Sequence, residues 1–168
     1  QNLEVSQASE RMKGEPGSEL KLKVRKGRGD TIEDVILIRE RIHISDVIYY
    51  GMLKDTIGYI QIGGFTLNGA KDVRRAFESL KSTGGMKRII LDLRGNGGGL
   101  MSEAIEIVSM FVPKGTLVVS QRGKDPRMNE EFRTTSEPID TEIPIMVLVN
   151  SGSASSSEIV AGALQDLD

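Results

Sequence analysis

Five serines in one short stretch could supply the nucleophile for acyl transfer. They lie within residues 150–159, which read Asn-Ser-Gly-Ser-Ala-Ser-Ser-Ser-Glu-Ile, between an apolar run and a helix containing Ile159, Val160 and Leu164. A serine at the start of such a helix is exposed, and the free N–H groups of the first turn point at whatever lies beside it. These donors can stabilise an oxyanion, as acyl transfer to a serine requires.

The same serines have two plainer interpretations. Serine is a favoured N-cap, and several in a row before an apolar helix often do nothing more than cap it. A phosphate-binding loop is less well supported, because the pattern G-x-x-x-x-G-K-[ST] is absent. The G-x-S-x-G pattern of a nucleophile elbow is absent too, although the physical arrangement is the same.

A second candidate loop follows the apolar run Ile89-Ile90-Leu91. Residues 94–99 read Arg-Gly-Asn-Gly-Gly-Gly, and such a glycine run presents backbone N–H groups that no side chain shields. It could hold a phosphate or an oxyanion, or be a flexible connection. Four glycines at the end of a core strand cost entropy on folding, which disfavours a plain linker. G-x-G-x-x-G is not matched, so a dinucleotide site is disfavoured.

Composition excludes several other chemistries. The chain has no cysteine, which rules out disulfides, thiolate zinc sites and cysteine nucleophiles. Its only histidine, His43, alternates with Ile42 and Ile44 in an extended run, which favours a surface strand over a Ser-His-Asp triad. Acidic residues are scattered, so no metal site is predicted. A net charge of −2 without a basic stripe argues against nucleic acid as the main partner.

The region from about residue 45 to the end must position both loops. Periodicity predicts strands at 57–62, 88–93, 116–120 and 145–149, and helices at 70–81, 101–112 and from about 154. The runs at 89–91 and 145–149 are near-continuously apolar, as in strands covered on both faces. Strands that alternate with helices predict an α/β fold with a largely parallel sheet, whose sites form at the carboxyl ends of the strands.

The first 44 residues have a different character. A helix is expected over 3–13, stopped by Gly14-Glu15-Pro16-Gly17, followed by strands at 20–25 and 32–39 that a turn at 26–30 connects. These elements are too few to bury a core by themselves.

Taken together, the motifs resemble the carboxyl-terminal processing, or tail-specific, proteases. The resemblance rests on the sequences at 90–100, 147–150 and 152–166, and on residues 58–62 and 76–81. It implies a crotonase/ClpP-like core of βα units with a mostly parallel sheet. It also implies a serine endopeptidase that uses a Ser/Lys dyad, needs no cofactor and cleaves proteins near flexible, apolar C-termini.

The resemblance assigns roles to individual residues. The nucleophile falls on Ser155, and the oxyanion donors fall on the backbone N–H of Ser156 and of the glycine run, with Gly98 or Gly99 expected. Ser156 stands where the family usually has alanine, which allows a competing hydroxyl. Asp166 matches a residue of structural support. The lysine base and its glutamine would lie beyond residue 168, so the 168-residue chain is predicted not to cleave peptides.

The resemblance also divides the chain. Residues 1–44 look like the C-terminal half of a PDZ-like domain, a module that binds peptide C-termini, with a helix-hairpin appendage as the alternative. Residues 45–168 would be the N-terminal part of the catalytic core. The expected partners are proteins or peptides with unstructured C-termini, and exposed apolar edges make self-association possible. The expected location is the cell envelope or periplasm.

Two other functions compete with the peptidase. One is a binding module that captures peptide tails without cleaving them, which the missing lysine leaves open. The other is a crotonase-type acyl-transfer enzyme, which also uses glycine-loop donors but does not need the serine-rich helix start.

Overall fold

A computed structural model describes residues 4–25, 31–42 and 44–167. The chain folds as two compact units, residues 1–44 and 45–168. The predicted turn at 26–30 and His43 lie outside the described residues.

The first unit consists of helix α1 (Val5–Met12) and an antiparallel hairpin of β1 (Glu19–Arg25) and β2 (Ile32–Ile38). Arg39 connects the two parts, because its guanidinium donates to the Met12 carbonyl at 2.8 Å and to the Ser18 hydroxyl at 2.9 Å. No residue of α1 is buried. The assignment of this unit to a PDZ-like domain stays a prediction.

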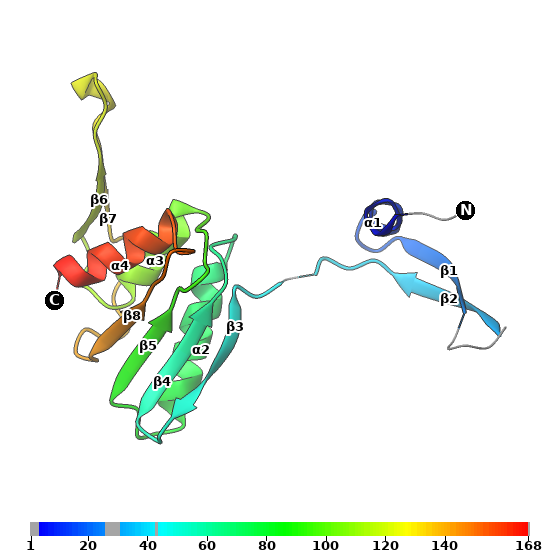
Figure 1. The fold of residues 1–168 in the computed structure, drawn as a ribbon, viewed down its shortest axis with the longest axis horizontal. Coiled ribbons are helices and arrows are strands. Elements are labelled where there is room, and N and C mark those ends of the chain that lie inside the picture. The colour runs from blue at the N-terminus through cyan, green and yellow to red at the C-terminus, as the bar shows by residue number, and fades with distance from the viewer. Residues whose placement is uncertain (1–3, 26–30, 43, 168) are drawn as a thin grey trace. The chain divides into compact units, whose positions relative to one another are not determined.

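The second unit is an α/β fold, as the sequence predicts. Its elements in chain order are β3 (Val47–Leu53), β4 (Ile57–Ile62), α2 (Gly69–Ser82), β5 (Arg88–Asp92), α3 (Met101–Ser109), β6 (Leu117–Gln121), the 3₁₀ turn η1 (Pro126–Met128), β7 (Glu130–Arg133), β8 (Ile145–Leu148) and α4 (Ser156–Asp166). The central sheet has the order β3-β4-β5-β8 (Figure 1). Only β3 is antiparallel to its neighbour, so the sheet is mostly parallel.

The core of this unit lies between the sheet and its helices. Helix α2 runs behind the strands in Figure 1 and turns the apolar face predicted from its periodicity toward them. The buried side chains from these helices are Ala70, Val73, Ala76, Phe77 and Leu80 of α2, Ala104, Ile107 and Val108 of α3, and Val160 and Ala163 of α4. They pack with Ile60, Ile62, Ile89 and Leu91 of the sheet.

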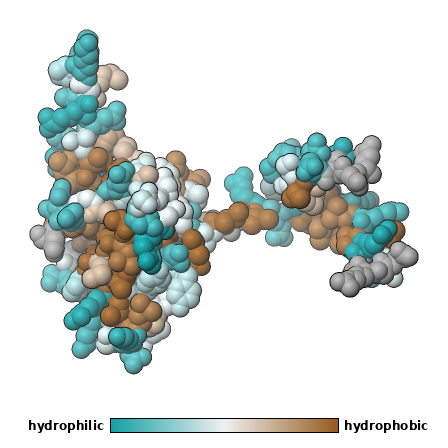
Figure 2. Space-filling view, in the orientation of Figure 1, coloured by the Kyte–Doolittle hydropathy of each residue, from teal (hydrophilic) through white to brown (hydrophobic). Residues whose placement is uncertain are grey.

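The second face of the sheet is only partly covered, which corrects one expectation. Ile90 is half-buried and Met146 is 59% exposed, although both lie in runs that we expected to be covered on both sides. Figure 2 shows apolar side chains gathered over the strands on this face. An apolar run therefore identified the strands but not the number of layers around them.

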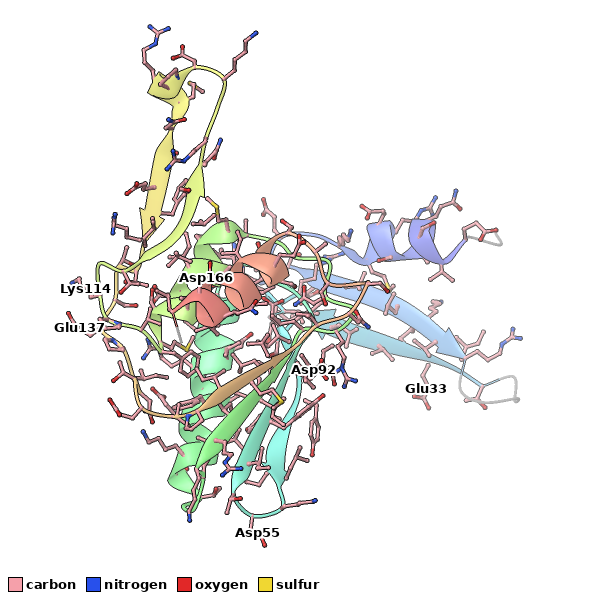
Figure 3. All side chains as sticks on the ribbon, turned by 60° about the vertical axis from the view of Figure 1, so that its left-hand side comes forward. Glu33, Asp55, Asp92, Lys114, Glu137 and Asp166 are labelled. Carbon is pink, nitrogen blue, oxygen red and sulfur yellow. The ribbon has the colours of Figure 1, made fainter. Side chains whose placement is uncertain are left out.

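Three strands differ from the sequence prediction, and one of them, β7, lies where no strand was expected. Strand β3 was not predicted. It joins β4 through a tight turn in which Lys54 and Asp55 have φ values of 49° and 59°, so no glycine marks the turn. Strand β6 was expected in the parallel sheet. It pairs instead with β7 in a separate antiparallel hairpin that extends from this unit (Figures 1 and 3). Pairing with β7, which is close along the chain, closes a shorter loop and costs less chain entropy than a crossover into the central sheet.

Among the described residues, no helix has the length and apolar character needed to span a bilayer.

Candidate active site

The carboxyl ends of β5 and β8 lie side by side, because the two strands are parallel neighbours with Asp92 opposite Leu148. The Leu93 N–H continues this pairing by donating to the Leu148 carbonyl at 2.8 Å. The glycine loop, residues 94–99, and the serine loop, residues 149–155, therefore leave the sheet at the same edge (Figure 1). The structure thus brings together the two segments that the sequence singled out for chemistry.

Hydrogen bonds from three serine hydroxyls and two backbone amides fasten the glycine loop to the serine loop and to the first turn of α4. The hydroxyl groups donate to backbone carbonyls of 93–99: Ser153 to Leu93 at 2.7 Å, Ser156 to Gly99 at 2.9 Å, and Ser157 to Asn96 at 2.8 Å. From the other side, Gly95 N–H donates to the Asn150 side chain at 2.9 Å. Ser156 is only 1% exposed, so its hydroxyl is buried and its proton is engaged with the Gly99 carbonyl, whereas the notion of a competing hydroxyl required a free one.

Ser155 is exposed and has an unusual backbone conformation. Its φ is 56° and its ψ is −115°, although it is the N-cap of α4. An ordinary N-cap has an extended backbone, as Glu4 does at the start of α1 with φ −63° and ψ 151°. A non-glycine residue in this region costs about 1–3 kcal/mol, and such strain gathers at functional sites.

Ser155 does cap helix α4, as one of the plainer interpretations predicts. Ser155 and Glu158 form a capping box, in which Ser155 N–H donates to the Glu158 carboxylate at 2.7 Å. Capping alone does not require a positive φ, since α1 also has a capping box on an extended N-cap. The strain therefore favours a second role for Ser155.

Gly98 and Gly99 occupy positions that no side chain could share. A Cβ on Gly98, where φ is 98°, would lie 2.8 Å from both the Ala154 carbonyl oxygen and the Ser155 Cβ. A Cβ on Gly99, where φ is 153°, would lie 2.4 Å from the Phe65 carbonyl oxygen. That carbonyl is held in place because it accepts from Leu100 N–H at 2.7 Å. The glycine loop is therefore in direct contact with the turn that carries Ser155.

The predicted oxyanion donors differ in their availability. Gly98 N–H donates to the side-chain oxygen of Asn96 at 2.9 Å. Within the described residues, the backbone N–H groups of Gly99 and Ser156 donate to no acceptor. The position of a Cβ on Gly98 lies only 3.0 Å from Ser156 N, so the free amide of the helix start is next to the glycine loop. Their role as oxyanion donors stays a prediction.

Arg94 and Tyr59 form a polar cluster around the buried carboxylate of Asp92, which residue spacing did not predict. Asp92 is 1% exposed and accepts from the Arg94 guanidinium at 2.6 Å and from the Tyr59 hydroxyl at 2.5 Å. Figure 3 labels Asp92 at the end of β5, directly before the glycine loop. Since Tyr59 is 33 residues away, spacing gave no signal of this contact. The cluster fixes the start of the glycine loop, because Arg94 N–H also donates to Asp92 at 2.9 Å.

The cluster predicts a pH-dependent stability. Hydrogen bonds from Arg94, assisted by Tyr59, lower the pKa of Asp92 from 3.8 to about 2, although burial opposes the shift. A carboxyl group whose pKa is lower in the folded state stabilises the fold above pH 3.8, and this stabilisation is lost as the pH falls toward 2. We expect Asp92→Asn to lower the free energy of unfolding at pH 7 by about 1–2 kcal/mol, allowing for the half-exposed Arg94. Urea unfolding at pH 7 and pH 2.5 measures the difference, which should shrink at the lower pH.

Asp125→Asn is the matched control for this experiment. Asp125 makes the same pattern of bonds to Arg127, two residues ahead, but on the exposed hairpin. Solvent screens that pair, so the substitution should leave unfolding unchanged. Equal effects of the two substitutions would contradict the role of burial at Asp92.

The other predictions concern Asp166, the general base and the absence of a metal site. Asp166 is exposed at the end of α4 (Figure 3), and its side chain makes no hydrogen bond or ion pair to another described residue, so its supporting role stays a prediction. In the part of the chain that is described, no lysine or histidine is hydrogen-bonded to Ser155, and no three His, Cys, Asp or Glu side chains gather to hold a metal ion.

Comparisons with known proteins agree on one kind of relative. The sequence pattern of peptidase family S41 matches residues 56–168. A carboxyl-terminal-processing protease of a Picosynechococcus species is 34% identical over 98% of this chain, and a carboxy-terminal-processing protease of Bartonella bacilliformis is 36% identical over 96%. The chain spans 39% and 37% of the lengths of these two relatives. Among solved structures, a photosystem II D1 C-terminal processing protease aligns with a TM-score of 0.62 and 28% identity, covering 92% of this chain and 42% of that protein.

Proposed function

Because the chain belongs to peptidase family S41, we propose that it carries the nucleophile, Ser155, of a serine endopeptidase that cleaves proteins near flexible, apolar C-termini. The observation that carries the proposal is the strained, exposed backbone of Ser155 at a helix start, with φ 56° and ψ −115°. The relatives named for carboxyl-terminal processing support the substrate class.

The proposed reaction uses groups from both loops. The Ser155 hydroxyl attacks the carbonyl carbon of the scissile peptide bond and gives its proton to a general base. The carbonyl oxygen becomes an oxyanion and accepts hydrogen bonds from backbone amides of the glycine loop and of Ser156. The C–N bond then breaks, the base returns the proton to the leaving amine, and water hydrolyses the acyl-enzyme.

We place the general base outside residues 1–168. A serine hydroxyl is a weak nucleophile without an adjacent base, and Ser155 has no hydrogen bond to a lysine among the described residues. The resemblance to the processing proteases supplies a lysine, oriented by a glutamine, from a later segment.

A polypeptide of residues 1–168 alone is therefore expected not to hydrolyse an unstructured peptide, while the full-length protein does. Release of new amino termini from a fluorogenic peptide with an apolar C-terminus measures the activity of both polypeptides. Steady hydrolysis by the 168-residue chain that Ser155→Ala abolishes would contradict the placement of the base. A full-length protein that binds such a peptide without cleaving it would instead indicate a binding module.

Residues 1–44 would then be the C-terminal half of a PDZ-like domain that recruits the peptide tail, and residues 45–168 the first part of the catalytic core. No cofactor is needed for this chemistry. The proposed location, the cell envelope or periplasm, follows from the resemblance to the processing proteases.

Self-association of the chain is also proposed. Its support is the groove of about 460 Å³ beside β8, whose lining includes the apolar residues Val147, Val149 and Leu164. Strand β8 is also the last strand of the described sheet, and an unpaired strand edge favours pairing with another chain.

A further inference from the structure

Asn96 is the most completely bonded residue of the glycine loop. It is 1% exposed, and its side-chain amide donates to the Ile62 carbonyl at 2.9 Å while its side-chain oxygen accepts from Gly98 N–H at 2.9 Å. Its backbone carbonyl accepts from Ala154 N–H at 3.1 Å and from the Ser157 hydroxyl at 2.8 Å. One residue thus connects the end of β4, the glycine loop and the turn that carries Ser155.

The side chain of Asn96 requires both a donor and an acceptor. An aspartate would keep the acceptor for Gly98 but would place a charged oxygen against the Ile62 carbonyl. An alanine would leave the buried Ile62 carbonyl without this donor and would release Gly98 N–H, at a cost of about 1–3 kcal/mol for each unsatisfied group. A carboxamide of this length satisfies both partners at once.

The bond to Gly98 also decides which amides remain for an oxyanion. Since Gly98 N–H is turned to Asn96, the unpaired amides beside Ser155 are those of Gly99 and Ser156. Gly98 then serves as the point of close approach, where the loop passes the Ser155 Cβ at a distance that only glycine allows. The glycine loop therefore has one spacing residue and one donor.

We propose that Asn96 is a positioning residue, which holds the glycine loop so that Gly99 and Ser156, and not Gly98, donate to the oxyanion. This inference rests on the proposed function of Ser155. An oxyanion forms only as the reaction proceeds, so a misplaced donor lowers kcat and leaves substrate binding largely intact.

The test compares Asn96→Ala and Asn96→Asp with the wild type in the full-length protein. Asn96→Ala is expected to lower kcat by about 10²-fold with KM changed less than about threefold. Asn96→Asp keeps the acceptor for Gly98 and should lose about tenfold in kcat. Hydrogen exchange of the Gly98 amide should be slow in the wild type and faster in Asn96→Ala, which reports the bond without reference to activity.

Ser109→Ala is the matched control for loss of a buried hydrogen bond. Ser109 is fully buried, and its hydroxyl donates to the Ile105 carbonyl at 2.8 Å within α3. This variant loses a buried hydrogen bond far from the two loops, so kcat should stay at the wild-type value. If neither Asn96 variant folds, the exchange rate of the Gly98 amide in the wild type still decides the question, because fast exchange there would contradict the bond on which the positioning role depends.

The outcomes separate this inference from the proposed function. Wild-type kcat in the folded Asn96 variants, together with an inactive Ser155→Ala, would overturn the positioning role alone. A fall in kcat of Ser109→Ala equal to that of the Asn96 variants would reduce Asn96 to a purely structural role. If Ser155→Ala keeps full activity, the proposed function itself fails.

Discussion

Ser155→Ala is expected to lower kcat of the full-length protein by on the order of 10⁴–10⁶-fold, because it removes the atom that would form the acyl-enzyme. The side chain is exposed and its backbone is already strained, so removing the hydroxyl should not unfold the protein. Cleavage of a peptide with an apolar C-terminus, measured under saturating conditions, gives kcat. A fluorophosphonate that labels the wild type should leave the variant unlabelled, which ties the loss to the nucleophile.

Ser151→Ala is the matched control for this substitution. Ser151 lies in the same loop and is also exposed, and its hydroxyl makes no hydrogen bond to another described residue. Its removal should change activity by less than about twofold. Retention of substantial activity by Ser155→Ala, or an equal loss in Ser151→Ala, would be incompatible with Ser155 as the nucleophile.

Alanine at Gly98 or Gly99 is expected to have the second largest effect, a loss of about 10²–10³-fold in kcat. A methyl group on Gly98 meets the Ser155 Cβ and the Ala154 carbonyl, so the two loops must move apart. On Gly99 it meets the Phe65 carbonyl, which moves the donor itself. Both positions have a positive φ, so each variant should also lose more than about 1 kcal/mol of stability.

Gly97→Ala is the control that shows whether the loss of activity comes from a steric clash or from replacing any glycine of the loop. Gly97 is exposed in the same loop, its backbone lies outside the left-handed region, and a Cβ there would meet nothing within 4 Å. Its substitution should change kcat by less than about twofold. Measurements of kcat and thermal unfolding for the three alanine variants test whether Gly98 and Gly99 are more sensitive than Gly97. Loss at Gly97 as large as at Gly98 would contradict the contact-based explanation.

Much of the second unit could be predicted from local periodicity. The apolar face of α2 and the strands β4, β5 and β8 follow from residue spacing, since each pattern is complete within a short segment. Strand β3 was missed because Lys54 and Asp55 form its turn without a glycine. The pairing of β6 with β7 was missed because no strand was predicted at 130–133, and because periodicity identifies a strand but not its neighbour.

The amino-acid sequence alone indicates which groups could do chemistry: a serine-rich helix start and a glycine loop, each after a strand of an α/β fold. Residue type and spacing are local properties, so one chain is enough to read them. Which of these groups are free to act depends on the folded structure. Ser156 and Ser157 reach carbonyls 57 and 61 residues away, and Asn96 takes the Gly98 amide. The hydroxyls and amides left over, at Ser155, Gly99 and Ser156, depend on how distant segments meet, and no spacing along the chain encodes that.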